Sequence, residues 1–162
     1  MGDVVKQFKV PVRIEYTAVA GSSPSLFLRE IKEGRIVGQR CPATGKVYVP
    51  PRGSSPTHGV VMTEEVPVKD TGVVTSFCIV NIPFPGQTMK IPYVGASIVL
   101  DGADSTLFHV IGECDPYEVR MGMRVKAVWK PPEERGYTLE SIRYFKPTGE
   151  PDADHDSFKG NF

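Results

Sequence analysis

The spacing of apolar residues divides the chain into an arm, a helix and a long β region. Up to Gly21, apolar and polar residues alternate weakly (Phe8, Val10, Val12, Ile14, Tyr16), which is typical of an extended arm lying on a neighbour. From Ser23 to Gly34 the apolar residues recur at helical spacing (Leu26, Phe27, Leu28, Ile31). This second pattern predicts a short amphipathic helix, with Ser23 as N-cap, Pro24 at the first helical position and an end at Gly34. Its apolar face either covers the edge of the next element or belongs to a partner subunit.

From Val60 onward the periodicity is that of β-strands. Six segments rich in β-branched and aromatic residues are separated by turn residues: 60–68, 72–82, 91–101, 106–112, 123–130 and 138–145. Before the fifth segment, Asp115 and Pro116 predict a single helical turn capped by Asp115. This order favours a small closed Greek-key barrel of the OB type, because a β-sandwich normally needs more strands. The polar tail that follows has too little apolar surface to fold alone, so we expect it to be disordered or to lie on a partner.

Residues 40–59 have the layout of a zinc ribbon. Two tight turns, 41–45 (CPATG) and 55–59 (SPTHG), are separated by a short hairpin arm. A structural zinc site takes four thiolate or imidazole ligands, but here Thr44 and Ser55 occupy two of the four places, beside Cys41 and His58. A hydroxyl that stays protonated near neutral pH replaces a thiolate poorly. We therefore predict a ribbon that has lost its zinc, and no other cofactor of its own.

Composition disfavours several classes of protein. Lys plus Arg and Asp plus Glu number 19 each, so no global positive charge points to nucleic acid or to an anionic membrane. Three widely spaced cysteines are unlike a secreted disulfide framework. No stretch approaches the roughly 20 apolar residues that span a bilayer. These features lead us to expect a cytoplasmic protein with reduced thiols and no membrane contact.

No catalytic constellation is visible in the sequence. His58, His109 and His155 have no cysteine, serine or carboxylate at a recognised catalytic spacing. Cys78 and Cys114 lack a cationic neighbour in sequence, so we interpret both as small buried apolar groups. The chain also has no glycine-rich loop for phosphates. We therefore predict that it performs no chemistry of its own.

Several segments in a fixed order carry a resemblance to a known family. They are residues 27–28, 34–42, 47–52, 122–125 and 142–147. Together they resemble the zinc-ribbon/OB-fold acyl-CoA-associated proteins, once catalogued as a domain of unknown function, and the resemblance covers about residues 23–154. The resemblance implies a mainly β (α+β) fold with an N-terminal helical segment, a rubredoxin-like zinc ribbon and a C-terminal OB barrel. The corresponding division is residues 1–35 for arm and helix, 36–60 for the degenerate ribbon, 61–147 for the barrel and 148–162 for the tail.

The same resemblance implies a non-catalytic role. Family members typically act as partners of thiolase-fold enzymes, including acetoacetyl-CoA thiolase with hydroxymethylglutaryl-CoA synthase, and the lipid-transfer-protein-like aldolases of steroid degradation. We therefore expect an accessory subunit in a hetero-oligomer that helps form the acyl-CoA site of such an enzyme, with the CoA thioester shared with the partner. The alternative is a single-stranded nucleic-acid-binding OB module, in which Phe77, Phe84, Tyr93, Phe108 and Trp129 would stack on bases. The balanced charge disfavours that alternative.

Three residues are candidates for contact with acyl-CoA or the partner. Phe84 lies in a proline-stiffened loop and either projects as a preorganised apolar contact or folds back to plug the barrel mouth. Arg52 follows two prolines, and its planar donor fork either meets a CoA phosphate or bonds nearby carbonyls. Tyr93 follows the loop of Phe84. We expect Arg52, Phe84 and Tyr93 to form one wall near the acyl-CoA site.

Overall fold

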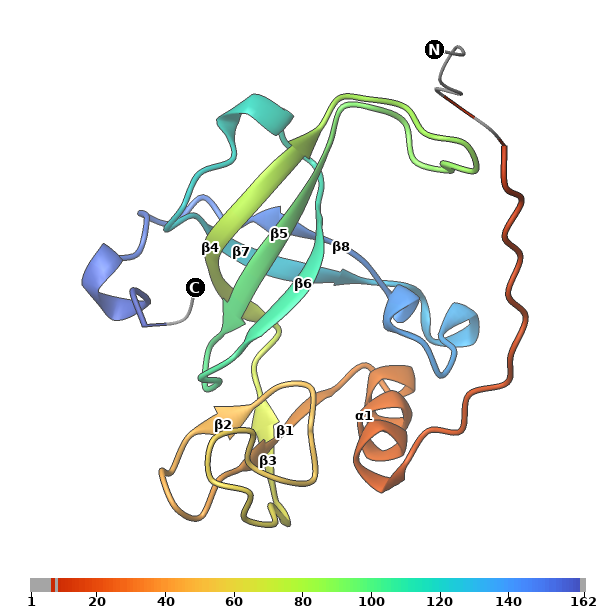
Figure 1. Ribbon diagram of the computed structural model, residues 1–162. Coiled ribbons are helices and arrows are strands. Elements are labelled where there is room, and N and C mark those ends of the chain that lie inside the picture. Colours follow the sequence, from red (N-terminus) through yellow and green to blue (C-terminus); the bar gives the residue numbers. More distant parts are fainter. Residues whose placement is uncertain (1–6, 8, 161–162) are drawn as a thin grey trace, which may run out of the picture.

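The computed structural model describes residues 7 and 9–160. Figure 1 shows a β-barrel, a small sheet below it and one helix, α1 (Ser22–Lys32), beside the sheet. The small sheet has the order β2-β1-β3 and contains β1 (Ile36–Arg40), β2 (Val47–Tyr48) and β3 (Glu64–Val68). The closed barrel has the order β4-β5-β6-β8-β7. Its strands are β4 (Thr71–Val80), β5 (Tyr93–Leu100), β6 (Thr106–Ile111), β7 (Arg124–Trp129) and β8 (Ile142–Pro147).

The architecture confirms the predicted fold class of helix, ribbon and OB barrel. A short 3₁₀ helix, η1 (Pro116–Glu118), precedes β7, and Asp115 caps it by accepting a hydrogen bond from the Tyr117 amide at 2.9 Å. Two further 3₁₀ turns, η2 (Pro132–Glu134) and η3 (Leu139–Ser141), lie between β7 and β8. Within the described residues, no helix is long and apolar enough to cross a membrane.

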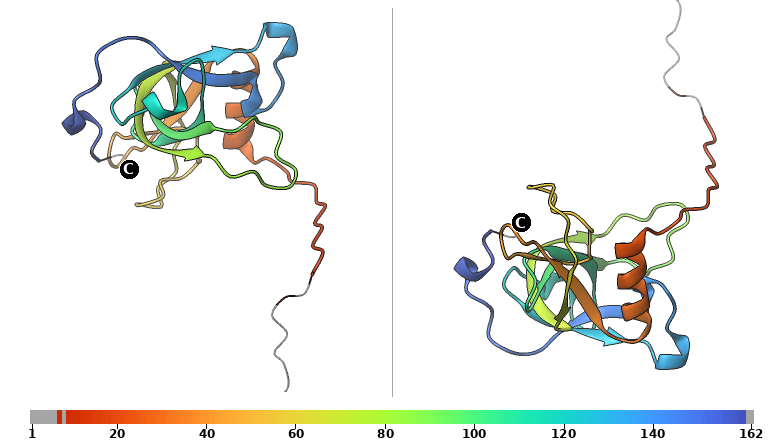
Figure 2. Two further views of the ribbon diagram at one scale, coloured as in Figure 1. Left: turned by 90° about the horizontal axis from the view of Figure 1, so that it is seen from above. Right: turned by 90° about the horizontal axis from the view of Figure 1, so that it is seen from below.

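The helix begins earlier than the sequence pattern predicts. Gly21 is its N-cap, so Ser23 and Pro24 lie inside the first turn, where a missing proline N–H costs no helical hydrogen bond. Phe27 and Ile31, four residues apart, are its buried apolar positions. Before the helix, residues 9–20 are all exposed and extend away from the body, as Figure 2 shows.

Strand β3 belongs to the ribbon sheet, although its periodicity placed it with the barrel strands. It pairs antiparallel with β1, with Val68 opposite Ile36 and Glu64 opposite Arg40. The pairing leaves only two residues, Lys69 and Asp70, before the first barrel strand. Periodicity identifies a strand but not its neighbour, so the sequence did not reveal this assignment.

One hydrophobic core runs through helix, ribbon and barrel. It includes Phe27 and Ile31 of α1, Val49 next to β2, and Val125 and Phe145 of the barrel. A second, smaller cluster joins buried Cys41, Tyr48 and Met62 inside the ribbon. Because the main core is continuous, the ribbon is held to the barrel by apolar packing.

The C-terminal tail folds back onto the barrel instead of remaining without structure. Arg120 donates two hydrogen bonds to Asp152, and the Ala153 amide donates to the Gly122 carbonyl at 2.8 Å. A further 3₁₀ turn, η4 (His155–Ser157), brings in Phe158, which is only 3% exposed. A few specific hydrogen bonds and one apolar side chain thus place a segment whose composition predicted disorder.

Candidate functional site

A groove of about 680 Å³ opens on the side of the barrel where β6 and β8 separate. These strands pair only at Ile111 and Phe145, so their remaining lengths leave a gap. The groove is lined from the β4–β5 loop by Met89, from β6 by Phe108 and Val110, and from the β7–β8 region by Leu139 and Ile142. This is the face, between two loops, on which OB folds generally bind their ligands.

The groove and the adjacent loop expose large apolar side chains. Phe108 is 62% exposed, and in the β4–β5 loop Phe84 is 54% and Ile82 79% exposed. Phe84 therefore projects into solvent and does not plug the barrel mouth. Such a gathering on a stiff loop beside a groove is typical of a binding surface.

His109 lies at the inner side of the groove and has a structural role. Its ring meets Phe145 edge-on, with ring centroids 5.6 Å apart, and its Nδ1 accepts a hydrogen bond from the Val110 amide at 2.9 Å. Burial is the largest influence on the pKa of His109 and lowers it from its ordinary value. The imidazole is therefore neutral near pH 7, which agrees with the interpretation of His109 as a satisfied barrel residue.

The charges around the groove are mixed. Lys130 and Arg143 line it together with Glu140. Arg143 also reaches Glu134, at 3.4 Å between Nη2 and Oε2. Cations balanced by carboxylates do not form the basic track that a nucleic-acid backbone requires.

The three predicted contact residues do not form a single wall. Phe84 and Tyr93 belong to the β4–β5 loop and the start of β5, whereas Arg52 lies in the ribbon, with its guanidinium 5.7 Å from the Tyr48 ring centroid. Figure 1 places the ribbon and this loop at opposite ends of the barrel. Strand β4 runs between the two ends and has 10 residues, a length of about 30 Å at 3.3 Å per residue. The prediction of a single wall was wrong, because proline-rich turns carry no information on which end of a barrel they occupy.

Sequence reasoning did not include the groove residues of β6 and the β7–β8 region in the predicted contact site, although it considered Phe108 for base stacking and His109 for catalysis. Phe108 and His109 lie in a run of apolar residues, and such a run does not show which side chains face outward. The exposed side of β6 became evident only from its pairing with β5, where Phe108 opposes Ser97. Cys78, expected to be buried, is exposed on β4.

The two degenerate knuckles keep the shape of a ribbon. The Gly45 amide donates to the Cys41 carbonyl at 2.8 Å, and the Gly59 amide donates to the Ser55 carbonyl at 3.0 Å. These matched turns bring Cys41, Thr44 and Ser55 together. Hydrogen bonds from the hydroxyl of Thr44 and then of Ser55 lower the pKa of the Cys41 thiol to about 7.

The donor set of the knuckles does not fit a structural zinc ion. One thiol and two hydroxyls converge, while His58 is exposed and its Nδ1 lies 2.7 Å from the Thr57 hydroxyl. In the described part of the chain, no three His, Cys, Asp or Glu side chains are grouped for a metal. Zinc strongly prefers thiolate and imidazole ligands, and two alcohols replace them poorly.

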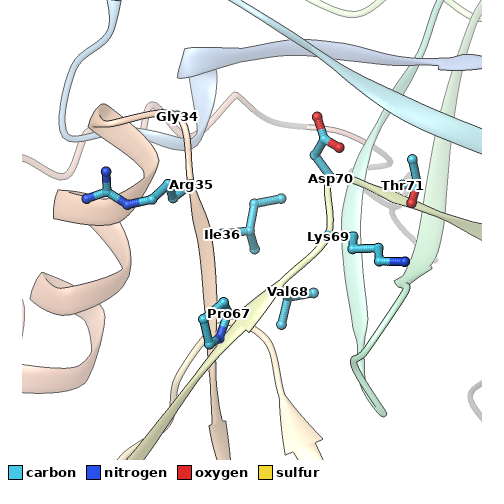
Figure 3. A pocket seen from close by; sticks show the side chains of 8 residues that line it. All are labelled: Gly34, Arg35, Ile36, Pro67, Val68, Lys69, Asp70 and Thr71. Carbon is cyan, nitrogen blue, oxygen red and sulfur yellow. The ribbon is translucent and has the colours of Figure 1, made fainter.

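A second pocket, between ribbon and barrel, lacks convergent charges. Arg35, Lys69 and Asp70 are among its lining residues. Figure 3 shows Arg35 directed toward α1, where its Nε donates to Glu30 at 2.6 Å, and Lys69 directed to the other side. Because the two cations diverge, this pocket does not form an anion site.

Comparison with known proteins connects both halves of the chain to one group. Residues 29–54 match the family model "ChsH2, rubredoxin-like zinc ribbon domain", and residues 65–130 match "ChsH2, C-terminal OB-fold domain". A protein from Methanocaldococcus jannaschii, described as a "DUF35 domain-containing scaffold protein", is 31% identical over 110 residues. That alignment covers 67% of this chain and 77% of the relative.

Two solved structures share the fold. A chain of the "Ltp2-ChsH2(DUF35) aldolase" is 24% identical, with a TM-score of 0.62 over 81% of this chain and 98% of the other. A DUF35-family protein of unknown function from Sulfolobus solfataricus is 20% identical, with a TM-score of 0.60 over 78% and 86% of the two chains.

Proposed function

This chain belongs to the DUF35 family, and from that premise we propose that it is the non-catalytic accessory subunit of a thiolase-fold enzyme acting on acyl-CoA thioesters. The observation that carries the proposal is the groove beside β6 with its exposed apolar loop, where the lining imidazole, His109, accepts a hydrogen bond from the Val110 amide and packs against Phe145. The name of the Methanocaldococcus relative as a scaffold protein, and the shared fold with a chain of an aldolase complex, support a role within an assembly.

The exposed apolar residues are suited to closing a thioester site. Full burial of a side chain the size of Ile82, Phe84 or Met89 is worth roughly 1.5–3 kcal/mol, and these residues are already 41–79% exposed in the free chain. On docking, the stiff β4–β5 loop would cover the acyl part of the site and exclude water, while the partner supplies the catalytic groups. Tyr93, at the base of this loop, belongs to the same contact.

Arg52 takes a separate part in this proposal. It lies at the ribbon end, about 30 Å from the loop by the length of β4. We assign it to a contact with the partner, or with the phosphate of CoA where a ligand approaches the ribbon end. Its planar guanidinium suits either a carboxylate or a phosphate.

The test is reconstitution with a thiolase-fold subunit. A tagged chain is isolated from its own cells, a stoichiometric thiolase-fold partner is identified by mass spectrometry, and the pair is then co-expressed. The pair should release or consume CoA thioester faster than the partner alone, and Phe84→Ala should reduce this gain. Val61→Ala is the matched control, because Val61 is an exposed apolar residue (68%) in the ribbon. A pair whose turnover is unaffected by this chain would refute the proposal.

One observation supports the competing function, single-strand binding. The groove combines the exposed ring of Phe108 with Lys130 and Arg143, as stacking sites in OB folds do. Binding of a fluorescent oligothymidylate that weakens steeply between 50 and 200 mM salt would favour that function. We expect no such binding, since Glu140 and Glu134 offset the cations.

A further inference from the structure

Strand β6 has an open edge along the groove. One edge of β6 pairs with β5 over the full length from Thr106 to Ile111. The opposite edge, which borders the groove, pairs with β8 only at Ile111. Because the Gly112 amide donates to the Phe145 carbonyl, strand alternation turns the amides of Val110 and Phe108 toward the same open side. Val110 donates to a neighbouring imidazole, and among the described strands none faces Phe108 there. An unpaired edge of this kind is a template for an added strand.

The N-terminal arm has the pattern of a strand that has no sheet. Its even positions from 10 to 16 are apolar and 62–82% exposed: Val10, Val12, Ile14 and Tyr16. Its odd positions from 9 to 17 are Lys9, Pro11, Arg13, Glu15 and Thr17. Such an alternation puts all the apolar side chains on one face of an extended segment. Among the described arm residues before Ala20, the hydrogen bonds run within the arm itself, from Arg13 to Glu15, and Figure 2 shows the arm extending away from the body.

The arm is attached close to the groove. It ends at Gly21, and α1 then packs against η3, whose Leu139 lines the groove. Fully extended, residues 17–21 reach over about 16 Å. The 11 residues of α1 have the same expected length, about 16 Å, so this linker is long enough to run alongside the helix to the groove. Residues 9–16 then remain to lie along β6. The docked arm and β6 would run antiparallel. Strand β6 begins at the ribbon, where Ser105 is hydrogen-bonded to the Val49 backbone, and the arm ends at the ribbon.

We propose that residues 9–16 of the arm dock within the same chain as an antiparallel strand on the open edge of β6, with their apolar face on the groove. Pro11 fixes the register, because it has no N–H and must turn its backbone outward. The even-numbered residues then turn their amides toward β6, and their side chains share one face. Tethering favours the chain's own arm over a free peptide, since a short linker gives a high effective concentration. The inference goes beyond the proposed function and stands independently of the partner.

Residue-resolved amide exchange by NMR on the full chain tests the proposal. The Phe108 amide should exchange several-fold more slowly in the wild type than in the double variant Val12→Asp/Ile14→Asp. The control, Arg13→Asp, changes the net charge by the same two units on the opposite face of the arm, leaves Pro11 in place and should keep the protection. The Leu107 and His109 amides, which alternation turns toward β5, are internal references and should not change.

Each other outcome contradicts the proposal. Equal exchange at Phe108 in the wild type and in Val12→Asp/Ile14→Asp would show that the arm does not cover the edge. Protection that appears only together with a dimer in light scattering would assign the site to the arm of a second copy. Exchange that changes equally at Leu107 and Phe108 would indicate a general loss of barrel stability.

Discussion

The phenyl ring of Phe108 lies directly over Gly95 of the neighbouring strand. A Cβ built at Gly95 would lie 2.6 Å from Cζ of Phe108, closer than two non-bonded carbon atoms approach each other. Because glycine has no Cβ, the Phe108 ring can lie across β5 at this position, beside the groove. Gly95 therefore determines where the Phe108 ring lies on the candidate binding surface.

Gly95→Ala should displace the Phe108 ring and weaken the complex with the partner by several-fold. The thermal midpoint should change little, because the ring is largely exposed and can swing aside. Isothermal titration with the co-expressed partner measures the effect. Gly95→Ala/Phe108→Ala should bind no worse than Phe108→Ala alone, since the two residues act through one ring. Additive losses would show that Gly95 acts independently of Phe108.

Phe84→Ala should weaken the same complex by about tenfold, an energy of ~1.4 kcal/mol, as expected for an apolar anchor on a preorganised loop. The isolated subunit should keep its thermal midpoint, because Phe84 is 54% exposed and lies outside the core clusters. Binding assays and thermal melts are needed on the same preparation. A large fall in the midpoint with binding intact would identify Phe84 as a structural residue.

The purified protein should contain no stoichiometric zinc, since two hydroxyls occupy ligand places beside Cys41. Elemental analysis by mass spectrometry decides this directly. The triple variant Thr44→Cys, Ser55→Cys and His58→Cys should bind one zinc ion, because both turns already have the ribbon geometry. One tightly held zinc per wild-type chain, lost only on unfolding, would contradict the prediction.

Much of the fold could be predicted from local chemistry. Asp115 and Pro116 mark the turn η1, and β-branched runs mark the barrel strands. The groove could not be predicted in the same way, because it arises where β6 and β8 pair at one position and then diverge. That divergence involves strands far apart in the sequence, so no local pattern records it. The fold of the C-terminal tail could not be predicted for a related reason. Phe158 is a single apolar residue in a polar segment, and only its burial in the structure reveals its role.

The degenerate knuckle should make stability depend on pH around neutrality. The pKa of Cys41 is lowered to about 7 by the hydroxyls of Thr44 and Ser55, against an ordinary thiol value of 9.0. A lowered acid pKa stabilises the folded state above the unfolded pKa, and this contribution is lost as pH falls through the folded pKa. The free energy of unfolding should therefore rise from pH 7 to pH 9 in the wild type more than in Cys41→Ala. Parallel curves for the two proteins would refute the lowered pKa.

A partly buried ion pair at the barrel's end should govern acid stability. Arg124 donates from both Nη atoms to the two carboxylate oxygens of Asp101, each at 2.7 Å, and Thr71 also donates to Asp101. The Arg124 hydrogen bonds are the largest cause of the lowered pKa of Asp101, and this lowering outweighs the effect of its partial burial. The stabilisation is therefore complete above the ordinary carboxyl pKa near 4 and is lost as pH falls through the lower, folded value.

Arg124→Met should consequently lose about 1.5–3 kcal/mol of unfolding free energy at pH 7, the range for hydrogen bonds to charged groups. The loss should shrink as the pH falls from about 4 through the lower, folded pKa of Asp101, because the carboxylate then binds a proton in the folded wild type and the ion pair no longer contributes. Urea unfolding at a series of pH values measures both effects. Arg143→Met is the matched control, since Arg143 has only a 3.4 Å contact with an exposed carboxylate and should cost little at any pH. Equal losses in the two variants, or a loss that is independent of pH, would show that the Arg124–Asp101 pair does not hold this end of the barrel.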